Sequence, residues 1–198
     1  MKIPLPIYII SWSVLLVTLL QGCTRVESRE EYYSYLLNEE NGLLFSTASQ
    51  QVELKIIYTP PELVAWKSYP EEEICQVVEE YAEYVSFEMR LTPKSENTNL
   101  LLAGIGSGEE FAIRQKYLDF DLKNNLFLVS GLDTLVCTNY HKSRNYGLTP
   151  YQSIEFSFWG LPIGEGVKLI LDDRLFNLGR NEFIIKKDAL ADLPKLCN

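Results

Sequence analysis

The 198-residue sequence has little positive charge and a single histidine, His141. It contains 18 Lys and Arg residues against 27 Asp and Glu residues, which gives a formal net charge of −9. A nucleic-acid-binding protein needs a basic surface to match phosphate charge, so this balance argues against that class. One histidine excludes a zinc site built on two imidazoles, and no two of the four cysteines have C-x-x-C spacing. We therefore expect no nucleic-acid partner, no metal site and no cofactor.

The sequence also lacks a complete catalytic motif. The glycine-rich stretch Gly104–Gly108 has neither G-x-G-x-x-G nor Walker spacing, so it predicts a hinge rather than a phosphate-binding loop. Cys137 and His141 are the nearest approach to a nucleophile and its base. On an extended strand, however, four residues separate them by about 13 Å. We therefore assign no catalytic residue and favour a non-enzymatic function, with a hydrolase as an alternative.

Long apolar runs are confined to the N-terminus. Lys2 precedes a segment from Ile3 to Leu20 that carries no charged residue. Pro4 and Pro6 lie at its start, and the uninterrupted remainder is short for a helix that crosses a bilayer. A positive start followed by a short apolar stretch is typical of a secretory signal peptide.

The junction Leu20-Gln21-Gly22-Cys23 resembles the lipobox of bacterial lipoproteins. In that family a signal peptidase cuts before the cysteine, and its thiol carries a diacylglycerol. The resemblance implies that residues 1–22 are a signal peptide and that Cys23 is the lipidated first residue of the mature chain. Two or more acyl chains anchor a protein stably, so we expect a lipid-anchored protein of the cell envelope. Thr24, in place of aspartate, favours the outer membrane over the inner membrane; the alternative is an uncleaved anchor or an ordinary signal peptide.

Three cysteines remain beyond the lipobox: Cys75, Cys137 and Cys197. An odd number in an oxidising compartment allows one disulfide and one free thiol. The sequence does not choose which two of the three form the pair. The alternative is that all three are small buried apolar side chains.

Residues 23–42 predict a lipidated N-terminus followed by a short helix, because Ser28 and Glu31 have the spacing of a capping box. We expect this helix to be a spacer between the anchor and a single α+β domain of residues 43–198. From Ile74 to Val85, apolar residues recur at helical spacing and glutamates fill much of the remaining surface. This segment predicts the clearest helix of the domain.

Strand patterns dominate the second half of the sequence. Polar and apolar residues alternate in short segments separated by glycines. The predicted strands are 43–48, 51–58, 87–91, 126–130, 134–140, 153–159, 167–171 and 182–186. Because the helices precede most strands instead of alternating with them, the sequence predicts an α+β fold. We expect helices of the N-terminal half to pack on a mainly antiparallel sheet or a small β-sandwich.

One segment gathers basic and aromatic residues in an otherwise acidic protein. It contains Tyr140, His141, Lys142, Arg144 and Tyr146. Loops of this composition are suited to contacts with a partner, so we interpret these residues as a partner-binding site and expect a protein partner. The sequence thus predicts a membrane-anchored lipoprotein that acts as a non-enzymatic binding or assembly module. The alternatives are an immunity or inhibitor lipoprotein, whose acidic face neutralises a secreted basic toxin, and an envelope hydrolase.

Overall fold

The computed structural model describes residues 28–95, 99–145, 148–160 and 166–197. The predicted signal peptide, the lipobox and Cys23 lie outside these residues, as does Tyr146. Within the described ranges, no helix is long and apolar enough to cross a membrane.

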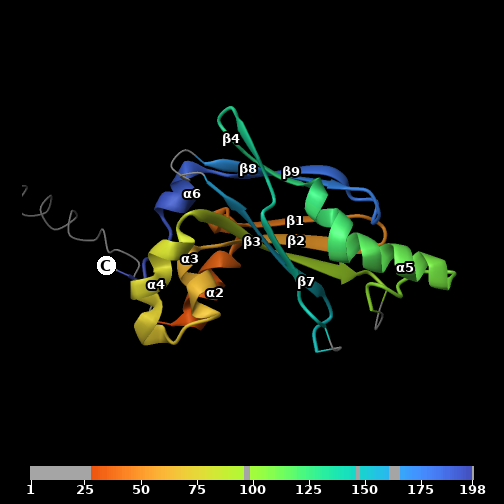
Figure 1. Cartoon of the computed structure of the whole chain (residues 1–198), viewed down its shortest axis with the longest axis horizontal. Coiled ribbons are helices and arrows are strands. Elements are labelled where there is room, and N and C mark those ends of the chain that lie inside the picture. The colour runs from red at the N-terminus through yellow and green to blue at the C-terminus, as the bar shows by residue number, and fades with distance from the viewer. Residues whose placement is uncertain (1–27, 96–98, 146–147, 161–165, 198) are drawn as a thin grey trace, which may run out of the picture.

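Two antiparallel sheets form the framework (Figure 1). The five-stranded sheet has the order β1 (Leu44–Ala48), β2 (Val52–Thr59), β3 (Tyr84–Pro93), β7 (Gln152–Trp159) and β6 (Asn139–Lys142). The four-stranded sheet has the order β5 (Asp133–Val136), β4 (Leu126–Ser130), β8 (Val167–Asp173) and β9 (Gly179–Ile185). Every neighbouring pair is antiparallel, so the predicted α+β class and the antiparallel character of the strands are confirmed.

The helices gather mainly at one end of the sheets. They are α2 (Arg29–Leu36), α3 (Pro61–Trp66), α4 (Ile74–Tyr81), α5 (Gly108–Lys116) and α6 (Lys187–Ala191). Figure 1 shows α2, α3, α4 and α6 together at one end, with α5 toward the other. The location predicted for the helices thus holds for α2, α3 and α4, whereas α6 joins the same end from the C-terminal part of the chain.

The predicted hairpin forms as the alternation indicates. Leu44 lies opposite Ile57 and Ala48 opposite Glu53, across a turn in which the Ser49 hydroxyl accepts the N–H of Gln51 at 3.1 Å. Apolar residues of β2 face the core at every second position, and its last four residues are all buried because both faces of the strand are covered there.

The single strand predicted over residues 134–140 is wrong, because this segment forms β5 and β6 in different sheets. The chain changes sheets at Cys137 and Thr138, where the Thr138 N–H donates to the Ser157 carbonyl at 2.9 Å. Both halves alternate with a period of two residues, and alternation carries no information about which strand is the partner. The sequence pattern therefore does not predict the change of sheet.

Helix α2 packs in the core and is therefore not the spacer that the sequence predicts. Its predicted cap is present, since the Ser28 hydroxyl accepts the N–H of Glu31 at 3.1 Å. Tyr32 and Leu36 have no exposed surface and belong to the main hydrophobic core. The packed fold therefore begins with α2, before residue 43.

Asp173 organises the turn that follows β8. This buried carboxylate accepts the hydroxyl of Tyr117 and the backbone N–H groups of Leu175, Phe176 and Leu178, at 2.9 to 3.2 Å. The four donors replace the water that the carboxylate loses on burial. The turn is thus fixed to the helical segment around Tyr117.

Candidate functional site

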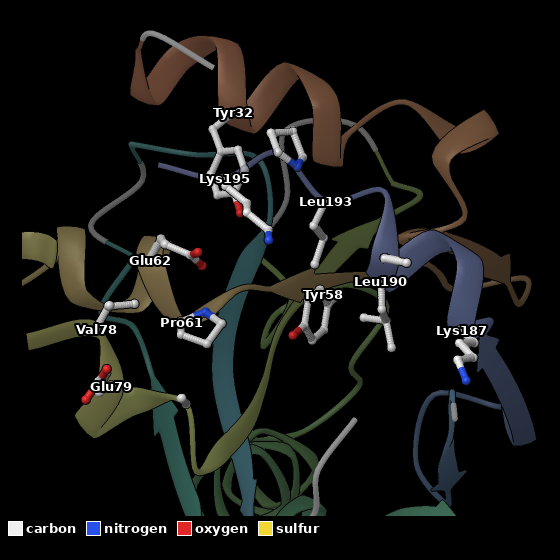
Figure 2. A pocket seen from close by; sticks show the side chains of 13 residues that line it. Tyr32, Tyr58, Pro61, Glu62, Val78, Glu79, Lys187, Leu190, Leu193 and Lys195 are labelled. Atoms are coloured by element: carbon white, nitrogen blue, oxygen red, sulfur yellow. The ribbon is translucent and has the colours of Figure 1, made fainter. Parts of the chain in front are cut away.

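A cavity of about 520 Å³ lies where α2, α3, α4 and the C-terminal segment meet (Figure 2). We call it the tyrosine cavity, after Tyr32 and Tyr58. Its apolar wall includes Val78 from α4 together with Leu190 and Leu193 from the C-terminal segment. The residues come from segments far apart in the sequence, so the cavity exists only in the folded chain.

Two buried tyrosines line this cavity. Tyr32 comes from α2 and Tyr58 from β2, and neither side chain is more than 1% exposed. Within the described residues, the Tyr32 hydroxyl has no hydrogen-bond partner. Burial raises the pKa of both tyrosines, and the nearby charge of Glu62 adds to the effect. Both hydroxyls therefore stay protonated at neutral pH.

Glu62 and Lys195 add charge to the same space. Glu62 stands in the first turn of α3, where burial raises the pKa of its carboxyl, while its own backbone N–H and the charge of Lys195 partly offset the rise. Lys195 is exposed on the C-terminal segment, and no salt bridge joins it to Glu62 among the described residues. Figure 2 shows Tyr32, the Glu62 carboxylate and the Lys195 side chain close together in the view, whereas the Tyr58 oxygen points toward Pro61.

A disulfide fastens two walls of the tyrosine cavity to each other. It joins Cys75, on α4, to Cys197, two residues after Lys195. The sequence left three pairings open, and the structure selects this one. The wall formed by Val78 is thereby linked covalently to the wall formed by Leu193 and its neighbours.

Cys137 is the remaining cysteine, and it is free and buried. Burial raises the pKa of its thiol to about 11, although the charge of Lys123 opposes the rise. The thiol donates to the Asn139 carbonyl at 3.0 Å. A protonated, buried thiol is a weak nucleophile, so these surroundings do not support a catalytic pair with His141.

The predicted partner-binding residues do not converge on one site. The Tyr140 hydroxyl donates to the Leu118 carbonyl at 2.6 Å, and Lys142 forms a salt bridge with Asp119. His141 points to the opposite face of β6 and is exposed. Alternation along the strand thus places residues that are neighbours in the sequence on opposite faces of the sheet.

Arg144 is exposed beyond the end of β6, and Tyr146 lies outside the described residues. His141 borders a smaller cavity of about 340 Å³, opposite Glu155 of β7. In that cavity Glu155 is already paired with Lys67 at 2.6 Å. Its polar groups are therefore more fully partnered than those of the tyrosine cavity.

The residues of the tyrosine cavity were not identified from the sequence. Glu62 was visible only as part of a helix start, and Tyr32 only as part of an apolar helical stretch. Lys195 has no neighbouring motif at all. Because α2, β2, α3, α4 and the C-terminal segment each supply part of the lining, no local spacing marks the site.

Comparison with known proteins identifies no family and no function for this chain. No protein-family model matches the sequence, and no curated protein is similar to it. The chain is similar to a crystal structure of a protein of unknown function from Burkholderia pseudomallei, with 11% sequence identity and a TM-score of 0.40. The match covers 83% of this chain and 89% of that chain. A similarity at this level carries no argument about function.

Proposed function

We propose that the protein is a membrane-anchored lipoprotein of the bacterial cell envelope, held through Cys23 with the outer membrane favoured, and that it acts as a non-enzymatic binding module. The anchor is supported by the resemblance of Leu20–Cys23 to a lipobox. The binding role is supported by the tyrosine cavity, which replaces the segment around His141 as the proposed site.

The observation that carries the binding role is the unpartnered, fully buried hydroxyl of Tyr32. Leaving such a group unsatisfied costs about 1–3 kcal/mol, and folded proteins rarely retain this cost without a reason. Tyr32 lines a cavity that also contains the half-buried carboxylate of Glu62. A ligand that exposes the Tyr32 oxygen by a small side-chain movement and hydrogen-bonds to it recovers part of that cost on binding.

The proposed anchor places this cavity near the membrane. Arg29, the first residue of α2, follows Cys23 by six residues. A chain of that length spans at most about 20 Å, so α2 stays close to the bilayer. Tyr32 of α2 lines the cavity. A partner in the same membrane, or at its surface, is therefore within reach.

The inhibitor or immunity role is the second candidate, and the charge around α4 favours it. Glu79 lines the cavity and is exposed. Four more exposed glutamates, Glu71, Glu72, Glu73 and Glu80, lie on or just before the same helix. A partner with a basic surface would be attracted to this rim.

A pull-down from detergent-solubilised native membranes tests both parts of the proposal. The full chain is compared with Cys23→Ala, with Ala191→Trp, which fills the cavity from its rim, and with Ala48→Trp, a control at an exposed position outside the lining. We expect the wild type and Ala48→Trp to be membrane-bound and to retain a stoichiometric partner. Ala191→Trp should stay in the membrane and lose the partner.

Two results would overturn the proposal separately. Membrane fractionation of Cys23→Ala that matches the wild type would disprove the lipid anchor. Retention of every captured partner by Ala191→Trp would show that the tyrosine cavity is not the binding site.

A further inference from the structure

The acceptor groups of the tyrosine cavity are matched to a cation. A buried carboxylate is costly unless a positive charge or several hydrogen bonds compensate it. Glu62 is half-buried, and among the described residues its own backbone N–H and the more distant charge of Lys195 do not outweigh the effect of burial on its pKa. The carboxylate of Glu62 is therefore incompletely compensated in the free protein.

The two tyrosines complete this arrangement. An ammonium group has three N–H donors and no acceptor. The Glu62 carboxylate supplies acceptors for such a group, and Tyr32 and Tyr58 line the cavity beside it (Figure 2). The ring faces of the tyrosines attract cations in addition. Glu62 and Glu79 carry the negative charge of the lining, and Lys187 and Lys195 balance it, so the preference for a cation rests on the half-buried carboxylate of Glu62.

The apolar wall accounts for the rest of such a ligand. Val78, Leu190 and Leu193 line the cavity beside the polar groups. A methylene chain packs on such a surface while its charged end stays with polar partners. The shape and chemistry of the cavity therefore favour an amine on an aliphatic stem.

The side chain of Lys195 is itself an amine on an aliphatic stem. This side chain is exposed on the C-terminal segment, lines the cavity and partly offsets the rise that burial causes in the pKa of Glu62. We propose that the tyrosine cavity binds an alkylammonium group, and that the side-chain ammonium of Lys195 occupies the position of this group in the free protein. This inference rests on the proposed function, because it names what the binding module recognises. A lysine side chain of a partner protein and a free aliphatic amine share the required chemistry.

Titration calorimetry on the full chain in a non-ionic detergent tests the charge of the ligand. The probes are n-butylammonium, 1-butanol and butyrate, which share a short aliphatic stem and differ in charge. We expect saturable binding of n-butylammonium alone. Glu62→Gln should weaken it at least about tenfold, because a charge-assisted hydrogen bond is lost. Glu72→Gln, at an exposed glutamate outside the cavity lining, should leave it unchanged.

Lys195→Met provides the sharper test, because it keeps an aliphatic stem and removes the ammonium that competes with the ligand. We expect n-butylammonium to bind several-fold more tightly to this variant. A purely structural role of Lys195 would give no gain in affinity. Weaker binding of n-butylammonium to Lys195→Met, or binding of butyrate equal to that of n-butylammonium, would overturn the proposal, because the cavity would then not select an ammonium group.

Adding n-butylammonium to the pull-down separates the two sources of the amine. Release of the partner supports a lysine side chain of that partner, whereas saturable binding without release supports a free amine. If n-butylammonium does not bind but Ala191→Trp still loses its partner, the alkylammonium inference fails and the binding function stands. If it binds while Ala191→Trp keeps the partner, the proposed partner site fails and a free amine is the ligand.

Discussion

Cys75 and Cys197 are joined by a disulfide across 122 residues of sequence, and the bond connects α4 to the C-terminal segment. These two elements form facing walls of the tyrosine cavity. Disulfides persist in oxidising compartments, so the bond supports the proposed location in the cell envelope. It also ties the shape of the binding site to the redox state of the protein.

Replacing Cys197 with serine should lower the free energy of unfolding by about 2–4 kcal/mol. Without the cross-link, the unfolded chain is no longer closed into a long loop and gains conformational entropy. Urea denaturation of the wild type and of Cys197→Ser measures this difference. Reductant should bring the wild type to the stability of the variant and leave the variant unchanged. A wild type that is equally stable with and without reductant would contradict a stabilising role for the bond.

The Tyr32 hydroxyl should not stabilise the ligand-free protein. Tyr32→Phe removes a buried group that has no partner among the described residues, so stability should stay the same or rise by about 1 kcal/mol. Tyr140→Phe is the matched control, because it removes a hydroxyl that donates to the Leu118 carbonyl, and it should lower stability by about 1 kcal/mol. Thermal and urea unfolding compare the two. Equal destabilisation by both substitutions would show that Tyr32 has a partner in solution.

Glu88 should stabilise the fold increasingly as pH rises from acid. Burial alone raises the pKa of its carboxyl, but Arg90 outweighs this with hydrogen bonds of 2.8 and 3.0 Å, and Ser153 adds one of 2.9 Å, so the pKa is lowered. A lowered folded pKa contributes stability above the ordinary value of 4.5 and loses it as pH falls through the folded value. The loss of stability caused by Glu88→Gln should therefore shrink on acidification below that value.

Glu62 should show the opposite dependence on pH. Burial raises its pKa, so its favourable contribution is present below 4.5 and is lost as pH rises through the folded value. The stability of Glu62→Gln relative to the wild type should therefore improve as pH rises above 4.5. Urea denaturation at a series of pH values measures both variants. A pH-independent difference for Glu62→Gln would mean that this carboxylate is well solvated.

The parts of the fold that depend on local chemistry were predicted correctly. The Ser28 cap is one example, and the hairpin that pairs Leu44 with Ile57 is another. Hydroxyl caps and alternating strands act over a few residues, so the sequence records them directly. The α+β class follows from the order of such elements.

The features that depend on distant contacts were not predictable. The passage from β5 to β6 at Cys137 changes the partner strand without changing the alternation. Glu62 and Lys195 lie 133 positions apart in the sequence and face one cavity only because α3 and the C-terminal segment pack at the same end of the sheets. The residues predicted to bind a partner lie on different faces of β6, because neighbours on a strand point to opposite sides of the sheet, and their partner-binding role stays a prediction.

Asp173 and Asp172 allow the scaffold to be tested separately from the site. In Asp173→Asn the amide nitrogen cannot accept, so in either orientation two of the four donors around it lose their partner, and stability should fall by about 3 kcal/mol. Asp172 forms only a surface ion pair with Arg174, so Asp172→Asn should cost less than about 1 kcal/mol. Neither residue lines the tyrosine cavity, so both variants should bind n-butylammonium as the wild type does wherever they are folded. Urea denaturation measures the stability of the two variants, and titration calorimetry measures their binding of n-butylammonium.

Equal stability of the two variants would show that the turn after β8 does not depend on the buried carboxylate. Weakened binding by folded Asp173→Asn would show that this turn and the cavity are coupled.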